Sequence, residues 1–222
     1  MKALVTGGGG FLGLEVVRRL VARGDEVTSF SRSFHQELAD LGVRQVRGDL
    51  ADEPDVFRAL AGIECCFHVA AKTGVWGAAE DYELVNVRGT RNVVAGCLEH
   101  DVPRLVYTSS PSVCFDGGDH VRASNDLPYA RRFLCAYPRT KAEAERYVLF
   151  SNGRRELATC APRPHLIFGP GDPHLLPRLV ERARARKLRI VGRGDNEVTL
   201  CFVENAAHAH LLAADAVKPG AA

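Results

Sequence analysis

A tyrosine and a lysine four residues apart are the side chains of this sequence best suited to proton transfer. They are Tyr137 and Lys141, in a segment whose periodicity predicts a helix from about Tyr137 to Phe150. Side chains four apart on a helix lie on one face and meet. A tyrosine hydroxyl has an unperturbed pKa of about 10, and a neighbouring ammonium lowers that pKa by stabilising the phenolate. The pair is therefore a candidate acid–base group, although the same spacing occurs by chance in many helices.

Hydroxyl side chains stand at the end of a predicted strand that runs from Arg104 to Ser109. The triplet Thr108-Ser109-Ser110 lies where that strand closes. Ligands of parallel sheets bind at the carboxyl edge of the strands. A serine hydroxyl at that edge can hydrogen-bond a substrate oxygen beside the tyrosine, so we expect the triplet and the Tyr–Lys pair to form one site.

A glycine-rich segment near the N-terminus predicts a site for a dinucleotide. An apolar run, Lys2 to Val5, precedes Thr-Gly-Gly-Gly-Gly-Phe-Leu-Gly, and Leu14 to Ala22 follows with the pattern of an amphipathic helix. Gly7, Gly10 and Gly13 give the spacing G-x-x-G-x-x-G. Backbone N–H groups and the helix dipole at such a helix start favour a pyrophosphate. An ordinary strand-to-helix turn is the alternative, and the placement between strand and helix favours the dinucleotide.

The residues after the second predicted strand bear on which dinucleotide would bind. An acidic residue about 20 positions after the glycines commonly binds the ribose hydroxyls. Here Ser31 takes that position and Arg32 follows it. Because a guanidinium pairs bidentately with phosphate oxygens, we predict NADP, with NAD possible if Arg32 is a plain surface arginine. Asp49, in Gly-Asp-Leu, is placed either to meet the adenine edge or to cap a turn.

Apolar strands alternate with helices along most of the chain. Strands are predicted at 2–5, 26–31, 44–46, 65–71, 104–109 and 158–161, and helices at 14–22, 55–60, 82–100 and 137–150. This alternation predicts an α/β fold with a Rossmann-type doubly wound parallel sheet. We assign residues 1–161 to an NADP-binding Rossmann domain and 162–222 to substrate-proximal loops, a last strand and a helix. Residues 162–177, rich in proline and glycine, are expected to form a loop over the carboxyl edge of the sheet.

Composition indicates a cytoplasmic globular protein. The 222 residues carry a net charge of +2, with 46% hydrophobic and 25% charged residues, so composition gives no reason to expect a nucleic-acid partner. The basic cluster within 182–189 is expected to be a solvated helix face. Seven cysteines without C-x-x-C spacing are expected to be reduced thiols, and no apolar run approaches the roughly 20 residues of a membrane span. No metal is expected, because His208 and His210 are expected to flank a helix surface.

Taken in chain order, the motifs resemble the extended short-chain dehydrogenases/reductases, and most of all their 3β-hydroxysteroid dehydrogenase branch. The resemblance rests on segments 6–13, 48–50, 68–71, 85–92, 105–110, 137–141, 163–171 and 202–205. Within that branch, segments 70–76 and 169–172 resemble bacterial 2-alkyl-3-oxoalkanoate reductases of long-chain olefin biosynthesis, and sterol dehydrogenases are also similar.

The resemblance implies a role for each candidate residue. Tyr137 is implied to be the general acid/base, Lys141 its activator and ribose ligand, and Ser110 the anchor of the substrate oxygen. Asn86 is implied to brace the active-site helix, with plain helix packing as the alternative. Contacts with the cofactor are implied at Gly7, Gly10, Phe11, Leu12, Gly13, Arg32, Asp49, Leu50, Ala70, Tyr137, Lys141 and Pro164.

By the same resemblance, the expected reaction is hydride transfer between nicotinamide and a secondary alcohol or ketone. The expected substrate is apolar, either a 3β-hydroxysteroid or a long-chain β-keto acid. One alternative is a nucleotide-sugar epimerase, dehydratase or reductase, and another is a non-catalytic NADP-binding sensor module. Members of the family usually continue well past Asn205, so we expect the C-terminal lid to be missing here. A homodimer is a further expectation at the level of the family.

Overall fold

Short runs of apolar residues form one parallel sheet in the computed structural model, which describes residues 1–173, 175–190 and 192–220. The order of its strands is β3-β2-β1-β4-β5-β6. Their bounds are β1 Lys2–Thr6, β2 Glu26–Ser31, β3 Arg44–Arg47, β4 Cys65–His68, β5 Arg104–Tyr107 and β6 Ala158–Cys160. The reversal of strand order beside β1 makes this the Rossmann-type doubly wound sheet that the alternation of elements predicts.

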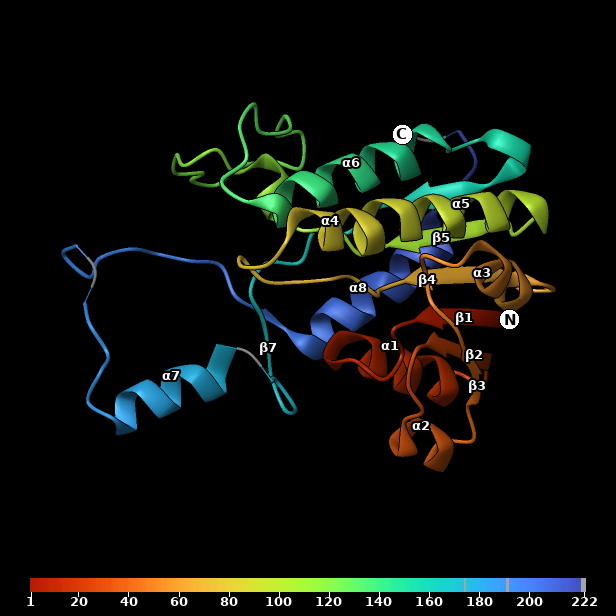
Figure 1. Ribbon diagram of the computed structural model, residues 1–222, viewed down its shortest axis with the longest axis horizontal. Helices are drawn as coiled ribbons and strands as arrows, with labels where there is room; N and C mark the ends of the chain where they lie inside the picture. The colour runs from red at the N-terminus through yellow and green to blue at the C-terminus, as the bar shows by residue number, and fades with distance from the viewer. Residues whose placement is uncertain (174, 191, 221–222) are drawn as a thin grey trace.

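Helices cover both faces of the sheet (Figure 1). One face is packed by α1 (Phe11–Ala22), α2 (Gln36–Asp40) and α8 (Val203–Ala216), and the other by α3 (Glu53–Leu60), α5 (Gly89–Glu99) and α6 (Ala136–Phe150). The short helix α4 (Ala79–Tyr82) and a π-helical segment, Glu83–Arg88, lead into α5. Strands buried on both faces need apolar runs, which the sequence supplies in β1 and β4, whereas the edge strand β3 is polar and partly exposed.

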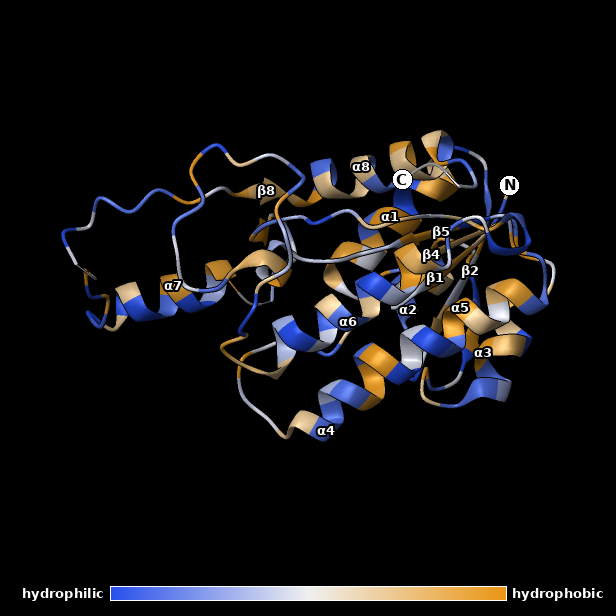
Figure 2. Cartoon of the chain, turned by 90° about the horizontal axis from the view of Figure 1, so that it is seen from above, coloured by the Kyte–Doolittle hydropathy of each residue, from blue (hydrophilic) through white to orange (hydrophobic). Residues whose placement is uncertain are grey.

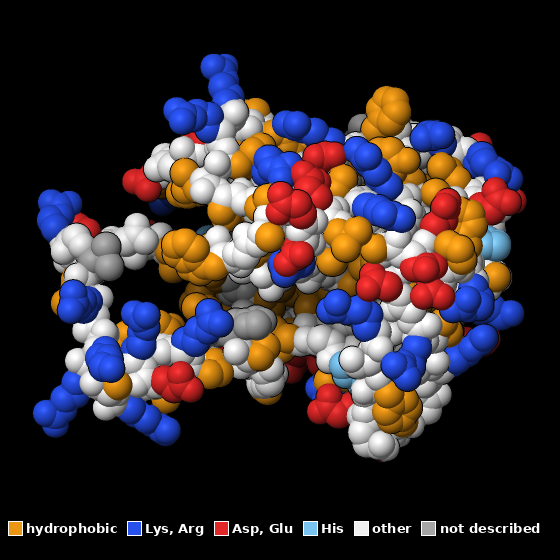
Figure 3. Space-filling view, viewed as in Figure 1, with side chains coloured by type: hydrophobic (Ala, Val, Ile, Leu, Met, Phe, Trp, Pro, Cys, Tyr) orange, Lys and Arg blue, Asp and Glu red, His pale blue; other side chains and the backbone are white. Residues whose placement is uncertain are grey.

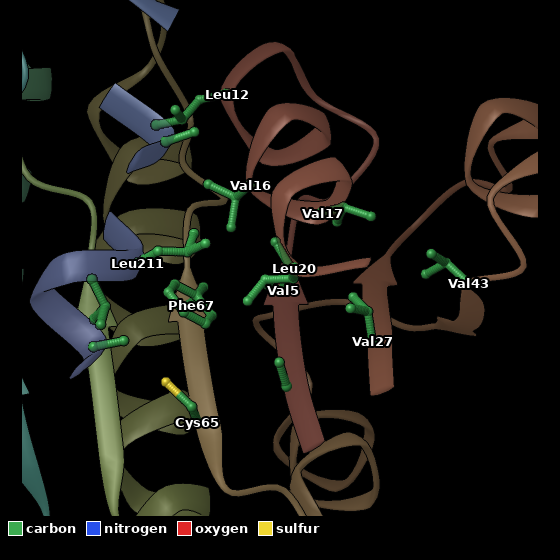
Figure 4. Close-up of a cluster of buried hydrophobic side chains, with 14 of the residues drawn as sticks. Val5, Leu12, Val16, Val17, Leu20, Val27, Val43, Cys65, Phe67 and Leu211 are labelled. Carbon is green, nitrogen blue, oxygen red and sulfur yellow. The ribbon is translucent and has the colours of Figure 1, made fainter. Parts of the chain in front are cut away.

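The alternation of side chains along β1 shows how the two cores are divided. Ala3 and Val5 belong to the core under α1, whereas Leu4 belongs to the core under α3 and α5. In Figure 4, Val16 and Leu20 of α1 point toward Val5 at the centre of the sheet. Each such side chain, when fully buried, contributes about 1.5–3 kcal/mol of hydrophobic free energy.

Several elements differ from the sequence-based expectations. The helix predicted over 82–100 is divided into α4, the π-helical segment and α5, and the strand predicted over 65–71 ends at His68. Helix α2 had no clear apolar period and was not predicted. Residues 162–177, expected to be a loop, contain β7 (Ile167–Phe168) and the start of α7 (Leu175–Arg184).

The C-terminal quarter first leaves the sheet and then returns to it. Strand β7 pairs in parallel with β8 (Cys201–Phe202). Helix α7, which lies between these two strands in the chain, stands apart from the six-stranded sheet (Figures 1 and 2). Arg182 and Arg184 of the predicted basic cluster are exposed on α7, where Figure 3 shows several cationic side chains. Helix α8 then packs against α1, so part of the predicted 162–222 region completes the core of the Rossmann sheet. The domain division at residue 161 stays a prediction.

Three further features of the described residues are relevant to function. All seven cysteines lie among them and are free thiols. Over the same residues, no group of three or more potential ligand side chains could hold a metal ion. None of the helices that the structure describes is long and apolar enough to cross a bilayer.

Candidate active site

The turn between β1 and α1 is shaped for close approach of a ligand to the backbone. Gly7 has a left-handed φ of +69°, and its N–H donates to the carbonyl of Phe30 at the end of β2 (2.9 Å). A Cβ on Gly13 would stand 2.1 Å from the carbonyl oxygen of Gly7, so only glycine fits there. No side chain caps the first N–H groups of α1, which Gly10 precedes and Phe11 and Leu12 begin. These N–H groups are free to bind an anion, so the turn fits a pyrophosphate.

A cavity lies beside this turn, between the carboxyl ends of the strands β1 to β4. Five of the predicted cofactor residues line it: Gly7, Arg32, Asp49, Leu50 and Ala70. Phe30, Ser31, Gly48, Ala71 and Val85 complete the lining. The cavity is therefore where the adenosine half of a dinucleotide would lie if its pyrophosphate occupied the glycine turn.

Ser31, at the end of β2, and Asp49, just after the end of β3, each make a local hydrogen bond that shapes a turn beside the cavity. The Ser31 hydroxyl donates to the carbonyl of Ser33 (2.7 Å), which shapes the turn carrying the exposed Arg32. The Asp49 carboxylate accepts from the N–H of Ala51 (2.9 Å). Asp49 thus has the turn role that the sequence left open, and it also lines the cavity.

Tyr137 and Ser110 meet at the same carboxyl edge. Tyr137 lies in the first turn of α6, and Ser110 stands three residues after the end of β5. Burial raises the pKa of Tyr137 above its ordinary value of 10, and a hydrogen bond with the Ser110 side chain partly offsets this rise. The lowering of this pKa that we predicted from Lys141 is therefore not what the structure shows. The Ser110 hydroxyl also lies 2.9 Å from that of Ser112.

Lys141 is buried one helical turn after Tyr137. Its ammonium donates to the carbonyl of Thr108 (2.6 Å) and lies 4.1 Å from the centre of the Tyr107 ring. Burial lowers the pKa of Lys141 to about 7, and the negative charge of Glu145 opposes that lowering. Lys141 is thus a cation held at the carboxyl end of β5, close to its point of deprotonation at neutral pH.

Thr108 links Lys141 to the C-terminal helix. Its carbonyl accepts from Lys141, and its hydroxyl lies 2.8 Å from Nε2 of His210 in α8. His210 Nδ1 lies 2.7 Å from the carbonyl of Ala206, which can only accept, so this nitrogen donates and Nε2 accepts from Thr108. His210, expected on a helix surface, is instead fully buried. The expectation was wrong because α8 packs this face onto the sheet.

Asn86 holds the segment after β4 against helix α6. Its side-chain amide accepts from the N–H of Lys72 (2.8 Å) and donates to the carbonyl of the same residue (3.0 Å). The amide nitrogen also lies 3.1 Å from the hydroxyl of Thr140, the residue before Lys141. Asn86 sits in the π-helical segment, a rare form that occurs mostly at functional sites. These contacts match the bracing role implied by the resemblance.

A buried ionic cluster next to the site was missed by the sequence analysis. Glu145 is fully buried on α6, four residues after Lys141, and pairs with Nε and Nη2 of the Arg163 guanidinium. The hydroxyls of Ser109 and Tyr129 also donate to its carboxylate. The repeated spacing of four from Tyr137 could have singled out Glu145, but its partners come from distant segments that carry no common motif. Pro164 directly follows Arg163 and lies half-buried on the way to β7.

Comparisons with known proteins agree with this geometry. The model of the "3-beta hydroxysteroid dehydrogenase/isomerase family" matches residues 4–220. The chain is 51% identical to 2-alkyl-3-oxoalkanoate reductase of Stenotrophomonas maltophilia over 100% of its own length and 68% of the relative's. It is 40% identical to the decarboxylating sterol-4-alpha-carboxylate 3-dehydrogenase of Mus musculus, over 100% of the chain and 61% of the relative. The chain therefore spans about two thirds of the length of these relatives.

A solved structure gives the same picture of the fold. The UDP-glucose 4-epimerase of Thermus thermophilus, solved in complex with NAD, superimposes with a TM-score of 0.84 at 28% identity. The match covers 98% of this chain and 76% of the epimerase. The parallel sheet and its flanking helices are thus those of a protein that holds a nicotinamide dinucleotide.

Proposed function

Because the chain belongs to the 3-beta hydroxysteroid dehydrogenase/isomerase family, we propose that it is a nicotinamide-dependent oxidoreductase acting on a secondary alcohol or its ketone. The observation that carries this proposal is the placement of Ser110, Tyr137 and Lys141. They lie at the carboxyl edge of the sheet that also carries the uncapped glycine turn. A proton donor and a dinucleotide cradle along one edge are the two parts that such a reaction needs.

The cofactor is held by the backbone at one end and by side chains at the other. The N–H groups at the start of α1 bind the pyrophosphate, and the cavity beside Asp49 and Leu50 takes the adenosine. Lys141 reaches toward the ribose next to the nicotinamide. When bound, the reduced nicotinamide supplies the hydride. We propose NADP as the preferred form, because Arg32 lines the adenosine cavity and Ser31 stands where a ribose-binding carboxylate is common.

The side chains of the chain itself handle the proton. In the reducing direction, Tyr137 donates its hydroxyl proton to the substrate's carbonyl oxygen, where negative charge develops. Ser110 donates its single hydroxyl proton in a hydrogen bond to the same oxygen, beside the Tyr137 hydroxyl that it contacts. Preorganised donors of this kind act where charge develops, in a site shielded from water. The elevated pKa of Tyr137 keeps it protonated, and therefore able to donate, at neutral pH.

We propose an apolar 3-oxo or 3-hydroxy compound as substrate. The support is that relatives at 51% and 40% identity are named for a 2-alkyl-3-oxoalkanoate and for a sterol carboxylate. Both names describe an oxygen at position 3 of a largely hydrocarbon molecule. Of the two, the 2-alkyl-3-oxoalkanoate is favoured by the higher identity.

Turnover of matched substrates tests this function. NADPH oxidation with a long-chain 2-alkyl-3-oxoalkanoate is expected, NADP⁺ reduction with a 3β-hydroxysteroid is expected to be slower, and UDP-glucose is expected to give no reaction. Activity on the nucleotide sugar alone would make the chain an epimerase or dehydratase and contradict the proposal.

The variant Tyr137→Phe separates catalysis from binding. It removes the proton donor and keeps the ring, so kcat is expected to fall by about 10²–10⁴-fold. Its dissociation constant for NADPH is expected to stay within about threefold of the parent's, since the hydroxyl is one of many contacts. Unchanged turnover in this variant would show that Tyr137 is not the proton donor, and a parent without turnover that still binds NADPH would favour a non-catalytic NADP-binding module.

A further inference from the structure

A fully buried carboxylate on the catalytic helix joins the segments that carry the reacting side chains. We propose that Glu145 is a positioning residue that, with Arg163, fixes the catalytic helix against the turn of Ser110 and supplies a buried negative charge beside Lys141. This inference rests on the proposed function, because it concerns how the Tyr137–Lys141 pair is held.

The hydrogen bonds of Glu145 use its whole carboxylate. One oxygen accepts from the Tyr129 hydroxyl (2.7 Å) and from Arg163 Nη2 (2.5 Å), and the other accepts from the Ser109 hydroxyl. Arg163 Nε contacts both oxygens, at 3.1 and 3.2 Å. A carboxylate has about four lone-pair sites, so these donors saturate it. A buried, saturated and bidentate pair has little freedom to move.

The donors come from three segments that border the reacting groups. Ser109 immediately precedes Ser110, Arg163 immediately precedes Pro164, and Tyr129 belongs to the loop between Phe115 and Cys135. Glu145 itself lies eight residues after Tyr137, on the same face of α6. Displacement of this one carboxylate would therefore loosen the anchor serine and the proline relative to the tyrosine.

The charge of Glu145 also acts on Lys141. The groups that interact with Lys141 are Glu145 from its own helix, the Tyr107 ring and Thr108 carbonyl from the β5 edge, and His68 from β4. His68 stays neutral, since burial lowers its pKa to about 3. Among these groups, Glu145 is the one that raises the pKa of Lys141 against the effect of burial. Arg163 pairs with Glu145 and moderates this effect without removing it.

Replacement of the carboxylate by its isosteric amide tests the electrostatic part. In Glu145→Gln, Lys141 loses the opposing anion while Arg163 keeps its positive charge, so the ammonium becomes easier to deprotonate. Titration of Lys141, followed by NMR on carbon-labelled lysine in the full chain, is expected to shift downward by about one pH unit. The alkaline limb of kcat for reduction of a 2-alkyl-3-oxoalkanoate is expected to shift by the same amount, with kcat at neutral pH about fivefold lower.

A shorter carboxylate distinguishes charge from shape. Glu145→Asp keeps the charge but loses a methylene, so Lys141 is expected to titrate near its original pH even though the protein is less stable. A residue that only fills space would show the opposite order, with Gln tolerated better than Asp. The matched control is Glu143→Gln, on the same helix α6. It removes an exposed ion pair with Arg91 of α5 and is expected to leave both readouts unchanged.

The outcomes separate this inference from the proposed function. If Lys141 titrates in Glu145→Gln as in the parent, or if Glu145→Asp shifts it as far as Gln does, the inference is wrong. If Glu145→Gln does not fold, the Asp variant decides: a shift of about one unit there contradicts the inference, and an unshifted titration supports it. Absence of turnover in the parent, together with the expected shift of Lys141 in Glu145→Gln, would overturn the proposed reaction and keep the positioning role.

Discussion

Lys141 is a candidate site residue whose positive charge is disfavoured by its buried position. A lysine is rarely fully buried, and here its ammonium has a backbone carbonyl and an aromatic ring as neighbours. Burial makes the ammonium a stronger acid than in water. The protein thus keeps a cation where apolar packing would favour a neutral side chain.

This burial predicts a dependence of stability on pH. The pKa of Lys141 is about 7 in the folded chain and 10.5 when unperturbed, so the unfolded chain binds the extra proton between these values. Above pH 10.5 Lys141 is neutral in both the folded and the unfolded chain, so its burial does not lower the unfolding free energy. As the pH falls toward 7, only the unfolded chain takes up the proton, and the unfolding free energy falls. Against Lys141→Met, the unfolding free energy of the parent is expected to rise by up to about 1.4 kcal/mol per pH unit in this window. Urea unfolding at several pH values measures it, and parallel curves for the two proteins would contradict it.

Arg32 carries the prediction on the choice of dinucleotide. Charge-assisted hydrogen bonds contribute about 1.5–3 kcal/mol, so Arg32→Gln is expected to weaken NADPH binding by about 10–100-fold. NADH has no 2′-phosphate, and its dissociation constant is expected to change little. Titration of both nucleotides checks this, with Arg91→Gln, an exposed arginine on α5, as the matched control. Equal weakening for NADPH and NADH would show that Arg32 does not contact the phosphate.

At the scale of elements, the π-helical segment joins two parts of the site. The wider turn at Glu83–Arg88 contains Asn86, whose amide bonds both backbone groups of Lys72 and the hydroxyl of Thr140. Helix α6 and the segment after β4 are thereby held at a fixed separation. The nicotinamide half of a dinucleotide would lie along this same edge.

Removal of the Asn86 amide is expected to cost both stability and activity. Asn86→Ala leaves the N–H and the carbonyl of Lys72 without their partner, and each buried unsatisfied group costs about 1–3 kcal/mol. The unfolding free energy is expected to fall by about 2–4 kcal/mol, and kcat to fall with it because α6 is less firmly placed. Chemical denaturation and steady-state kinetics measure the two effects. A variant as stable as the parent would show that water replaces the amide.

The sequence predicted the elements with strong periodicity and missed those set by tertiary contacts. The strands around the glycine turn and the helix of Tyr137 followed from short apolar runs and from spacing. The interruption before α5 was not predictable, because apolar periodicity does not register one wider turn. Likewise, the spacing of Tyr137 and Lys141 was visible, but the partners of Glu145 lie 16 to 36 residues away in the chain. The pKa of Tyr137 was misjudged for the same reason, since burial cannot be read from the spacing of two residues.

At the scale of the whole molecule, the C-terminal helix belongs to the first half of the fold. Helix α8 contributes Val203, Ala207 and Leu211 to the core beneath α1, and its His210 binds Thr108. Figure 4 shows Leu211 beside Phe67 of the central strand β4. The sheet, and the edge that carries the site, therefore depend on a helix that begins more than 90 positions after the Thr108-Ser109-Ser110 turn.

Two neighbouring leucines on α8 test this dependence. Leu211 is buried and Leu212 is 54% exposed. Leu211→Ala is expected to lower the unfolding free energy by about 2–5 kcal/mol through lost burial and a cavity. Leu212→Ala is expected to change it by less than about 0.5 kcal/mol. Urea denaturation compares them, and equal effects would mean that α8 does not pack as described.

The turn after β5 constrains how this protein can change in evolution. Thr108 bonds to α8, Ser109 to the carboxylate on α6, and Ser110 to the catalytic phenol. Three consecutive side chains thus meet three different partners. Insertion or deletion of one residue just before Thr108 would shift the whole turn by one position, so that each partner would face the wrong side chain. A point substitution in this turn removes one hydrogen bond at a time, whereas a one-residue insertion or deletion would break all three hydrogen bonds together.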